Sequence, residues 1–86
     1  MNCKTLLDNY VDDDTYVHLE MLKYSGTDNE PDVIAEIPTV KLSELGYADF
    51  RPFMKKEVLE ILPTIEPVDD APTPVLNIQA DGSDET

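Results

Sequence analysis

The first half of the chain carries one short helical pattern followed by two strand patterns. In residues 2–11 the apolar side chains recur at i, i+1, i+4 and i+5, which predicts a short N-terminal helix. Thr15 to Tyr24 is rich in β-branched and aromatic residues and is bounded by turn formers, as is typical of a strand. Its alternation directs Val17, Leu19 and Met21 to one side, which is the predicted core face.

A second strand is predicted over Val33 to Leu42, where apolar and polar positions alternate again. The polar loop Ser25 to Asp32 joins it to the first strand, so the two should form an antiparallel hairpin. Pro38 cannot donate a ladder hydrogen bond, so the second strand lies at a sheet edge or ends near that residue.

The register of this hairpin can also be predicted. Pairing Met21 with Ala35 aligns the core faces but sets Glu20 directly opposite Glu36, and like charges in that position are unfavourable. A shift by two residues pairs Met21 with Ile37, which keeps the same faces and separates the two carboxylates. We therefore expect the second register.

The strongest helical pattern covers Phe50 to Leu62. One stripe of a helix over this segment would carry its apolar residues: Phe50, Phe53, Met54, Val58, Ile61 and Leu62. Pro52 is tolerated in a first helical turn, and Pro63 would end the helix. We expect this helix to pack on the core face of the hairpin.

The composition changes at residue 64, where prolines and acidic residues become frequent. We expect a compact domain over residues 1–63 and a Pro-rich acidic tail over residues 64–86, extended or disordered. Within the tail, the alternating segment Val75 to Ala80 has three interpretations: a third strand added at an edge of the sheet, a docking motif for another protein, or disorder. The expected fold class is α+β, with a short N-terminal helix, an antiparallel β-hairpin and one amphipathic C-terminal helix.

The charge balance restricts the class of partner. The 86 residues include 19 acidic and 6 basic side chains, for a formal net charge of −13. Such a field repels nucleic-acid phosphates and anionic membranes, so direct binding to either is not expected. A basic protein surface would be attracted, although acidity can also serve solubility alone.

The residue types that support catalysis or metal binding are scarce. Cys3 is the only cysteine and His18 the only histidine, and nothing in the sequence brings them together, so neither an enzyme nor a cofactor is expected. The acids of residues 28–32 partly match a calcium loop, but its glycine and its final glutamate are replaced by Val33 and Thr39. No metal site is predicted.

These observations predict a small acidic inhibitor or regulator that binds a protein. Carboxylates on a rigid scaffold can imitate phosphates, which lie every ~1.7 Å along a DNA duplex, and so occlude a basic nucleic-acid-binding surface such as that of a nucleic-acid-processing enzyme. The predicted contact residues are Asp12, Asp13, Asp14, Asp28, Glu30 and Asp32. In size and charge alone, the chain is similar to small acidic inhibitors encoded by phages and mobile elements.

The alternative is a structural or assembly subunit of a virion or larger complex. It would bind through apolar contacts, from Tyr16, Leu22 and Tyr24 or from the C-terminal tail, and a homodimer is compatible with either interpretation. With no predicted signal peptide or membrane span, the expected location is cytoplasmic, in the host cytosol if a phage encodes the chain.

Overall fold

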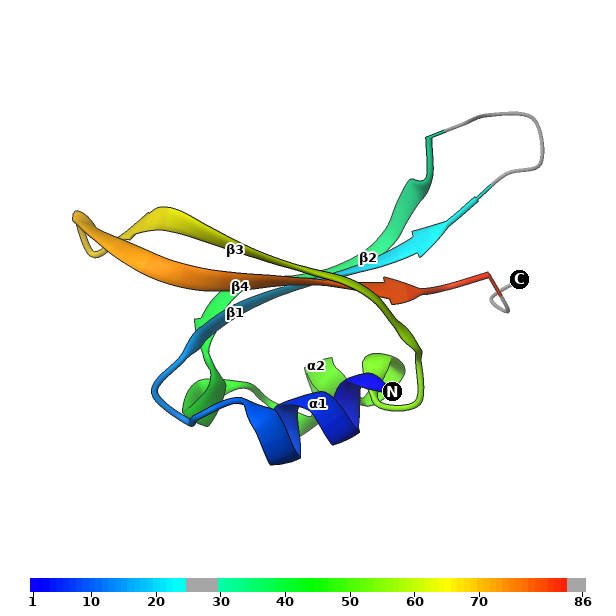
Figure 1. Cartoon of the computed structure of the whole chain (residues 1–86), viewed down its shortest axis with the longest axis horizontal. Helices are drawn as coiled ribbons and strands as arrows, with labels where there is room; N and C mark the ends of the chain where they lie inside the picture. The colour runs from blue at the N-terminus through cyan, green and yellow to red at the C-terminus, as the bar shows by residue number, and fades with distance from the viewer. Residues whose placement is uncertain (25–29, 84–86) are drawn as a thin grey trace.

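Four strands form one twisted sheet, and the helical segments cover one of its faces (Figure 1). The computed structural model describes residues 1–24 and 30–83. In chain order the elements are α1 (Cys3–Tyr10), β1 (Tyr16–Lys23), β2 (Asp32–Lys41), the 3-10 turn η1 (Leu42–Glu44), α2 (Tyr47–Phe50), the 3-10 turn η2 (Arg51–Phe53), β3 (Val58–Val68) and β4 (Ala71–Asp81). The predicted α+β class is confirmed.

Two antiparallel hairpins are joined side by side through a parallel pair of strands. The strand order is β2-β1-β4-β3, so β1 and β4 are the central strands and β2 and β3 are the edges. β1 and β4 run parallel, from the pair Tyr16–Val75 to the pair Leu22–Asp81. A parallel pair needs a long crossover, and here the chain from β2 through α2 to β3 provides it.

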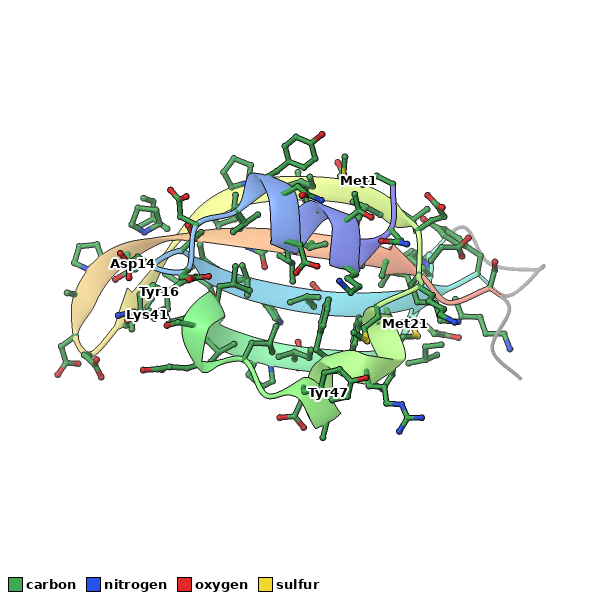
Figure 2. All side chains as sticks on the ribbon, turned by 90° about the horizontal axis from the view of Figure 1, so that it is seen from below. Met1, Asp14, Tyr16, Met21, Lys41 and Tyr47 are labelled. Carbon is green, nitrogen blue, oxygen red and sulfur yellow. The ribbon has the colours of Figure 1, made fainter. Side chains whose placement is uncertain are left out.

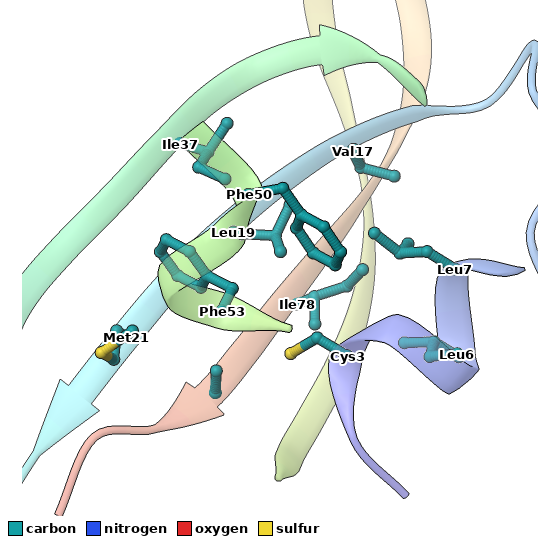
Figure 3. Packing of buried hydrophobic residues seen from close by; sticks show 11 residues of the cluster. Cys3, Leu6, Leu7, Val17, Leu19, Met21, Ile37, Phe50, Phe53 and Ile78 are labelled. Atoms are coloured by element: carbon teal, nitrogen blue, oxygen red, sulfur yellow. The ribbon is translucent and has the colours of Figure 1, made fainter. Parts of the chain in front are cut away.

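The core lies between the central strands and the helical segments (Figure 3). Val17, Leu19 and Met21 are 0%, 0% and 2% exposed, so the core face predicted for β1 is confirmed. They pack in one cluster with residues of β2, β4 and the helical segments: Cys3, Leu6, Leu7, Ile37, Phe50, Phe53, Ile78 and Ala80.

The short helix α1 forms where the sequence predicts it and is fixed at its start. The Asn2 side chain caps it by accepting a hydrogen bond of 2.8 Å from the backbone N–H of Thr5. The chain before β3 then holds this end, because Cys3 N–H donates to Lys56 O and Val58 N–H donates to Met1 O. Isolated helices of this length are only marginally stable in water. The helix α1 therefore depends on these hydrogen bonds and on the burial of its two leucines.

The β1–β2 hairpin forms, but its predicted register is wrong. Met21 pairs with Ala35, and Glu20 stands opposite Glu36. The register shifts twice along β2, between the partners of Val17 and Leu19 and between those of Met21 and Leu22. Glu36 forms an ion pair with His18, which compensates for its repulsion by Glu20. The predicted register took only the repulsion between the two glutamates into account.

The predicted amphipathic helix over residues 50–62 is also wrong. Helical structure ends with η2 at Phe53, and the second half of the segment belongs to β3. Phe50 and Phe53 do reach the core, whereas Ile61 and Leu62 are exposed. A short apolar run fits both a helical and a strand pattern, and pairing with β4 decides between them here.

The expected extended tail is part of the sheet up to residue 81. The boundary expected at residue 63 falls inside β3. Val75 to Ala80 lies within β4, so this segment is a strand of the sheet, but a central strand and not the expected edge strand. Its other two interpretations, a docking motif and disorder, do not apply.

The prolines that suggested a linker fit the β3–β4 hairpin because all of them occupy the same class of cross-strand pair. Every second pair of residues along this part of the ladder contains a proline: Pro63–Leu76, Ile65–Pro74 and Pro67–Pro72. Pairs of an antiparallel ladder alternate between hydrogen-bonded and non-hydrogen-bonded, and the adjacent turn-closing pair Val68–Ala71 is of the bonded type. The prolines therefore occupy non-bonded pairs, where no N–H is needed between the two strands.

The β3–β4 turn consists of two residues that both have positive φ. Asp69 and Asp70 have φ of 51° and 64°, as a type I′ turn requires. Aspartate tolerates this region better than most residues, but glycine is favoured at the second position. The turn thus keeps two charges at some conformational cost.

Replacing Asp70 with glycine should stabilise the fold by ~0.5–1 kcal/mol, because glycine adopts positive φ without steric cost. Urea unfolding followed by circular dichroism measures the change. Asp70→Ala is the control, since it removes the same charge and keeps the strain. An equal gain from alanine would show that relieved charge repulsion, and not backbone strain, is responsible.

Gly82 is a position where a side chain has no room. A Cβ built there would lie 2.7 Å from Ile34 Cδ1 and 2.8 Å from Met21 Cγ. We expect Gly82→Ala to destabilise the protein by ~1–3 kcal/mol through overpacking. Gly46→Ala is the control: its Cβ would meet only the Asp49 side chain, at 3.3 Å, and should change stability by no more than ~0.5 kcal/mol. Equal urea midpoints for the two variants would contradict the prediction.

Candidate binding surfaces

Acidic residues gather at the end of the sheet where β1 and β4 begin. Asp12, Asp13 and Asp14 precede β1, and Asp69 and Asp70 precede β4; all five are exposed. Because β1 and β4 run parallel, the two runs lie at the same end although more than 50 residues separate them. Figure 2 shows Asp14 at this end, beside Tyr16 and Lys41.

The β3–β4 hairpin carries part of this charge away from the rest of the sheet. Residues 71–74 of β4 have no partner on β1, so residues 65–74 form a projecting two-stranded arm. Its tip at Asp70 is five residues before Val75, or roughly 17 Å at strand spacing. Glu66 lies along the arm, where its Oε2 accepts a hydrogen bond of 3.3 Å from Thr39 Oγ1.

We call Asp12, Asp13, Asp14, Glu66, Asp69 and Asp70 the acidic end. The base at this end, Lys41, has its Nζ 5.8 Å from the centroid of the Tyr16 ring, a cation–π contact. Glu66, Asp69 and Asp70 are not among the predicted contact residues, because they lie in the segment predicted to be the tail. A signal was present: two aspartates between alternating segments are typical of a two-residue hairpin turn.

The other predicted contact residues do not join the acidic end. Asp32 begins β2 opposite Lys23, and Glu30 lies just before it, so both are at the far end of the β1–β2 hairpin. The eight residues of β1 span about 26 Å at strand spacing. Asp28 lies outside the described residues. The five predicted contacts that the structure describes therefore do not form one surface.

The face of the sheet opposite the helices carries a hydrogen-bonded row across all four strands. His18 of β1 bridges its neighbours: its Nε2 lies 2.7 Å from Glu36 Oε2 of β2, and its Nδ1 lies 2.8 Å from Asn77 Oδ1 of β4. Asn77 Nδ2 then donates to Thr64 Oγ1 of β3 at 2.6 Å. Both ring nitrogens face acceptor oxygens, which protonated imidazolium satisfies fully.

The surroundings of His18 favour its charged form. Partial burial lowers the pKa of His18, but hydrogen bonds to Glu36 and Asn77 and the charges of Glu36 and Glu20 outweigh it. The net pKa lies above the ordinary value of 6.5. The hydrogen bonds of His18 link β1 to both neighbouring strands, which suits a structural role.

Cys3 is fully buried in the core, and its thiol is hard to ionise. Burial, followed by the charge of Glu57, raises the pKa of Cys3 to about 11. Because the thiolate is the reactive form, this cysteine is unsuited to nucleophilic chemistry. Within residues 1–24 and 30–83, no three His, Cys, Asp or Glu side chains form a group able to hold a metal ion.

An open cleft of about 470 Å³ lies on the helical side, between α1 and residues 42–54. Its mouth carries Lys4, Asp8, Asp13 and Tyr47, and its walls are apolar. The backbone brings the two sides together, because Ser43 N–H donates to Asp13 O at 3.0 Å. Leu42 N–H likewise donates to Thr15 O, at 2.9 Å.

The edge strand β3 exposes apolar side chains on both of its faces. They are Leu59, Ile61, Leu62 and Ile65. Along this edge Pro63 and Pro67 lack the N–H that an added strand would bind, which protects β3 from strand addition.

Comparison with protein-family models, with curated proteins and with solved structures finds no match for this chain. Of the helices in the described parts of the chain, none has the length and apolar character needed to cross a membrane. The functional interpretation therefore depends on the surfaces themselves.

The stability of the protein should depend on the protonation of His18. Since the folded-state pKa is raised above 6.5, the stabilisation is fully present below that pH and is lost as the pH rises through the folded-state pKa. We expect the free energy of unfolding from urea titrations to decrease over this range.

Glu36→Gln is the matched variant, because it keeps a hydrogen-bonding partner for His18 but removes the charge. Its free energy of unfolding should decrease less over the same pH range. Subtracting the two profiles removes the contributions of groups that both proteins share. Identical pH profiles for the two proteins would exclude the proposed coupling.

Proposed function

We propose that this protein is an acidic inhibitor or regulator that occludes a basic nucleic-acid-binding surface of a partner protein. The observation that supports it best is the parallel pairing of β1 with β4, which brings the two aspartate runs to one end of the sheet. Negative charges that are clustered at one end of a protein attract a basic surface more strongly than the same number of charges spread evenly over the protein.

The dimensions of the acidic end are compatible with phosphate mimicry. Along β4, the acidic end extends over roughly 17 Å from the level of Val75 to the tip of the arm. One strand of a duplex places about five phosphates along that length, and the acidic end has six carboxylates. Five of the six side chains are exposed and available for contact.

Two features favour binding over catalysis. The Cys3 thiol is buried with a raised pKa, and both nitrogens of His18 are engaged in hydrogen bonds. We therefore propose a mechanism of steric and electrostatic occlusion, with no turnover.

The test is a pulldown with the full chain as bait, at low and high salt, with added duplex DNA as competitor. Charge mimicry predicts that captured proteins are basic, that salt releases them, and that DNA displaces them. Neutralising Asp69 and Asp70 to asparagine should reduce capture severalfold. Capture that resists both salt and DNA would contradict the proposal.

The matched control neutralises two acids at the opposite end, Glu30→Gln with Asp32→Asn. It removes the same net charge but leaves the acidic end intact, so it should reduce capture less. Equal losses from the two double variants would indicate that net charge alone attracts the partner. The contact roles predicted for Glu30 and Asp32 would be supported only if the control loses more.

The exposed apolar residues of β3 favour a second candidate, an assembly subunit. Deleting the tail cannot test it, because the deletion would remove the central strand β4. Ile65→Thr is suitable instead, since Ile65 is 67% exposed and threonine keeps β-propensity. In the same pulldown, a loss of capture with Ile65→Thr and none with the asparagine variant would favour assembly.

A further inference from the structure

The cleft between α1 and residues 42–54 leaves apolar surface open to solvent. Its volume is within the range of ligand pockets. Leu7 and Phe50 are buried in the core beneath it. The remaining apolar walls are only partly buried: Val11, Leu42, Leu45 and Met54. An apolar group that filled the cleft would cover this surface, which is favourable at ~25 cal/mol per Å².

The mouth of the cleft is electrically negative. Lys4 forms an ion pair with Asp8, so these two charges balance each other. Asp13 has no ion pair within the described residues and is flanked by two more aspartates.

The direction of α1 adds to this negative potential. The helix ends at Tyr10, and its C-cap residue Val11 is one of the cleft walls. The last carbonyl groups of a helix lack intrahelical donors and carry partial negative charge. No basic residue lies in the last turn of α1 to compensate for it. A cation from a ligand would be stabilised at this position.

From these features we infer that the cleft binds a short basic and apolar segment of a partner protein. An aliphatic or aromatic side chain of the segment fills the cleft, and a neighbouring lysine or arginine contacts Asp13 and the end of α1. This inference rests on the proposed function for the basic character of the partner. It adds an apolar anchor next to the acidic end, since Asp13 belongs to both surfaces.

Charge complementarity also decides against a second copy of the chain as the occupant. Each copy has a formal net charge of −13, so two copies repel at this mouth. The exposed β3 residues that a second copy would cover belong to the sheet edge and do not line the cleft. An acidic segment would lack the electrostatic attraction to Asp13, and a purely polar segment would lack the apolar contact inside the cleft.

The test uses the full chain labelled with ¹⁵N and three synthetic peptides of equal length. One alternates lysine with leucine, the second replaces leucine with serine, and the third replaces lysine with glutamate. We expect the lysine–leucine peptide to shift the amides of the cleft walls and to bind at least tenfold more tightly than the others. Part of this binding should persist at high salt, where exposed charges are screened.

A pair of exposed tyrosines provides matched variants. Tyr47 lies at the mouth and is 68% exposed, whereas Tyr10 is 70% exposed and does not line the cleft. Tyr47→Ser should weaken binding of the lysine–leucine peptide by about tenfold, and Tyr10→Ser should leave it unchanged. Because both side chains are exposed, neither substitution should disturb the fold.

The outcomes separate this inference from the proposed function. If the two lysine peptides bind equally and Asp69→Asn with Asp70→Asn weakens both, the cleft inference is wrong and charge-driven binding remains. If the glutamate–leucine peptide binds as well as the lysine–leucine peptide, the basic character of the ligand is wrong. Equal effects of Tyr47→Ser and Tyr10→Ser would also overturn the assignment to the cleft.

Discussion

The parallel pairing of β1 with β4 is the interaction on which the rest of the structure depends. It joins the N-terminal and C-terminal hairpins into one sheet and places both strands at the centre. Leu19 and Ile78, directly paired, are fully buried. Without this pairing each hairpin would be a two-stranded ribbon, which is marginally stable in water.

The same pairing determines where the helical segments lie. A parallel connection requires a crossover, and the crossover from β2 to β3 carries α2 and both 3-10 turns. Together with α1 it covers the core side of the central strands, where Phe50 and Phe53 contribute the large aromatic side chains. The cleft exists because α1 and the crossover meet over the sheet without closing the space between them.

A small sheet with two free edges must limit unwanted strand addition, and here prolines and bulges do so. β2 has Pro38 and two register shifts, and β3 has Pro63 and Pro67. High net charge acts in the same direction, since it opposes association between copies. Features that suggest a flexible linker in the sequence thus protect the edges in the fold.

The sequence by itself determined the α+β class, the short N-terminal helix, the first two strands and the core face of Val17, Leu19 and Met21. These follow from local alternation and helical spacing, which depend on neighbouring residues only. It also determined the net charge, from which the class of partner is proposed. Asp12, Asp13 and Asp14 were recognisable as candidate contacts for the same reason, and their role stays a prediction.

Only the tertiary structure decided the features that depend on pairing between distant segments. Residues 58–62 fit a helix locally, but their hydrogen bonds to β4 make them a strand. Glu20 lies opposite Glu36 because His18 and the shifts in β2 compensate for it. The acidic end and the cleft each combine residues more than 25 positions apart, so no local pattern specifies them. Non-local pairing outweighs local propensity here because burying the two central strands stabilises the chain more than one short helix would.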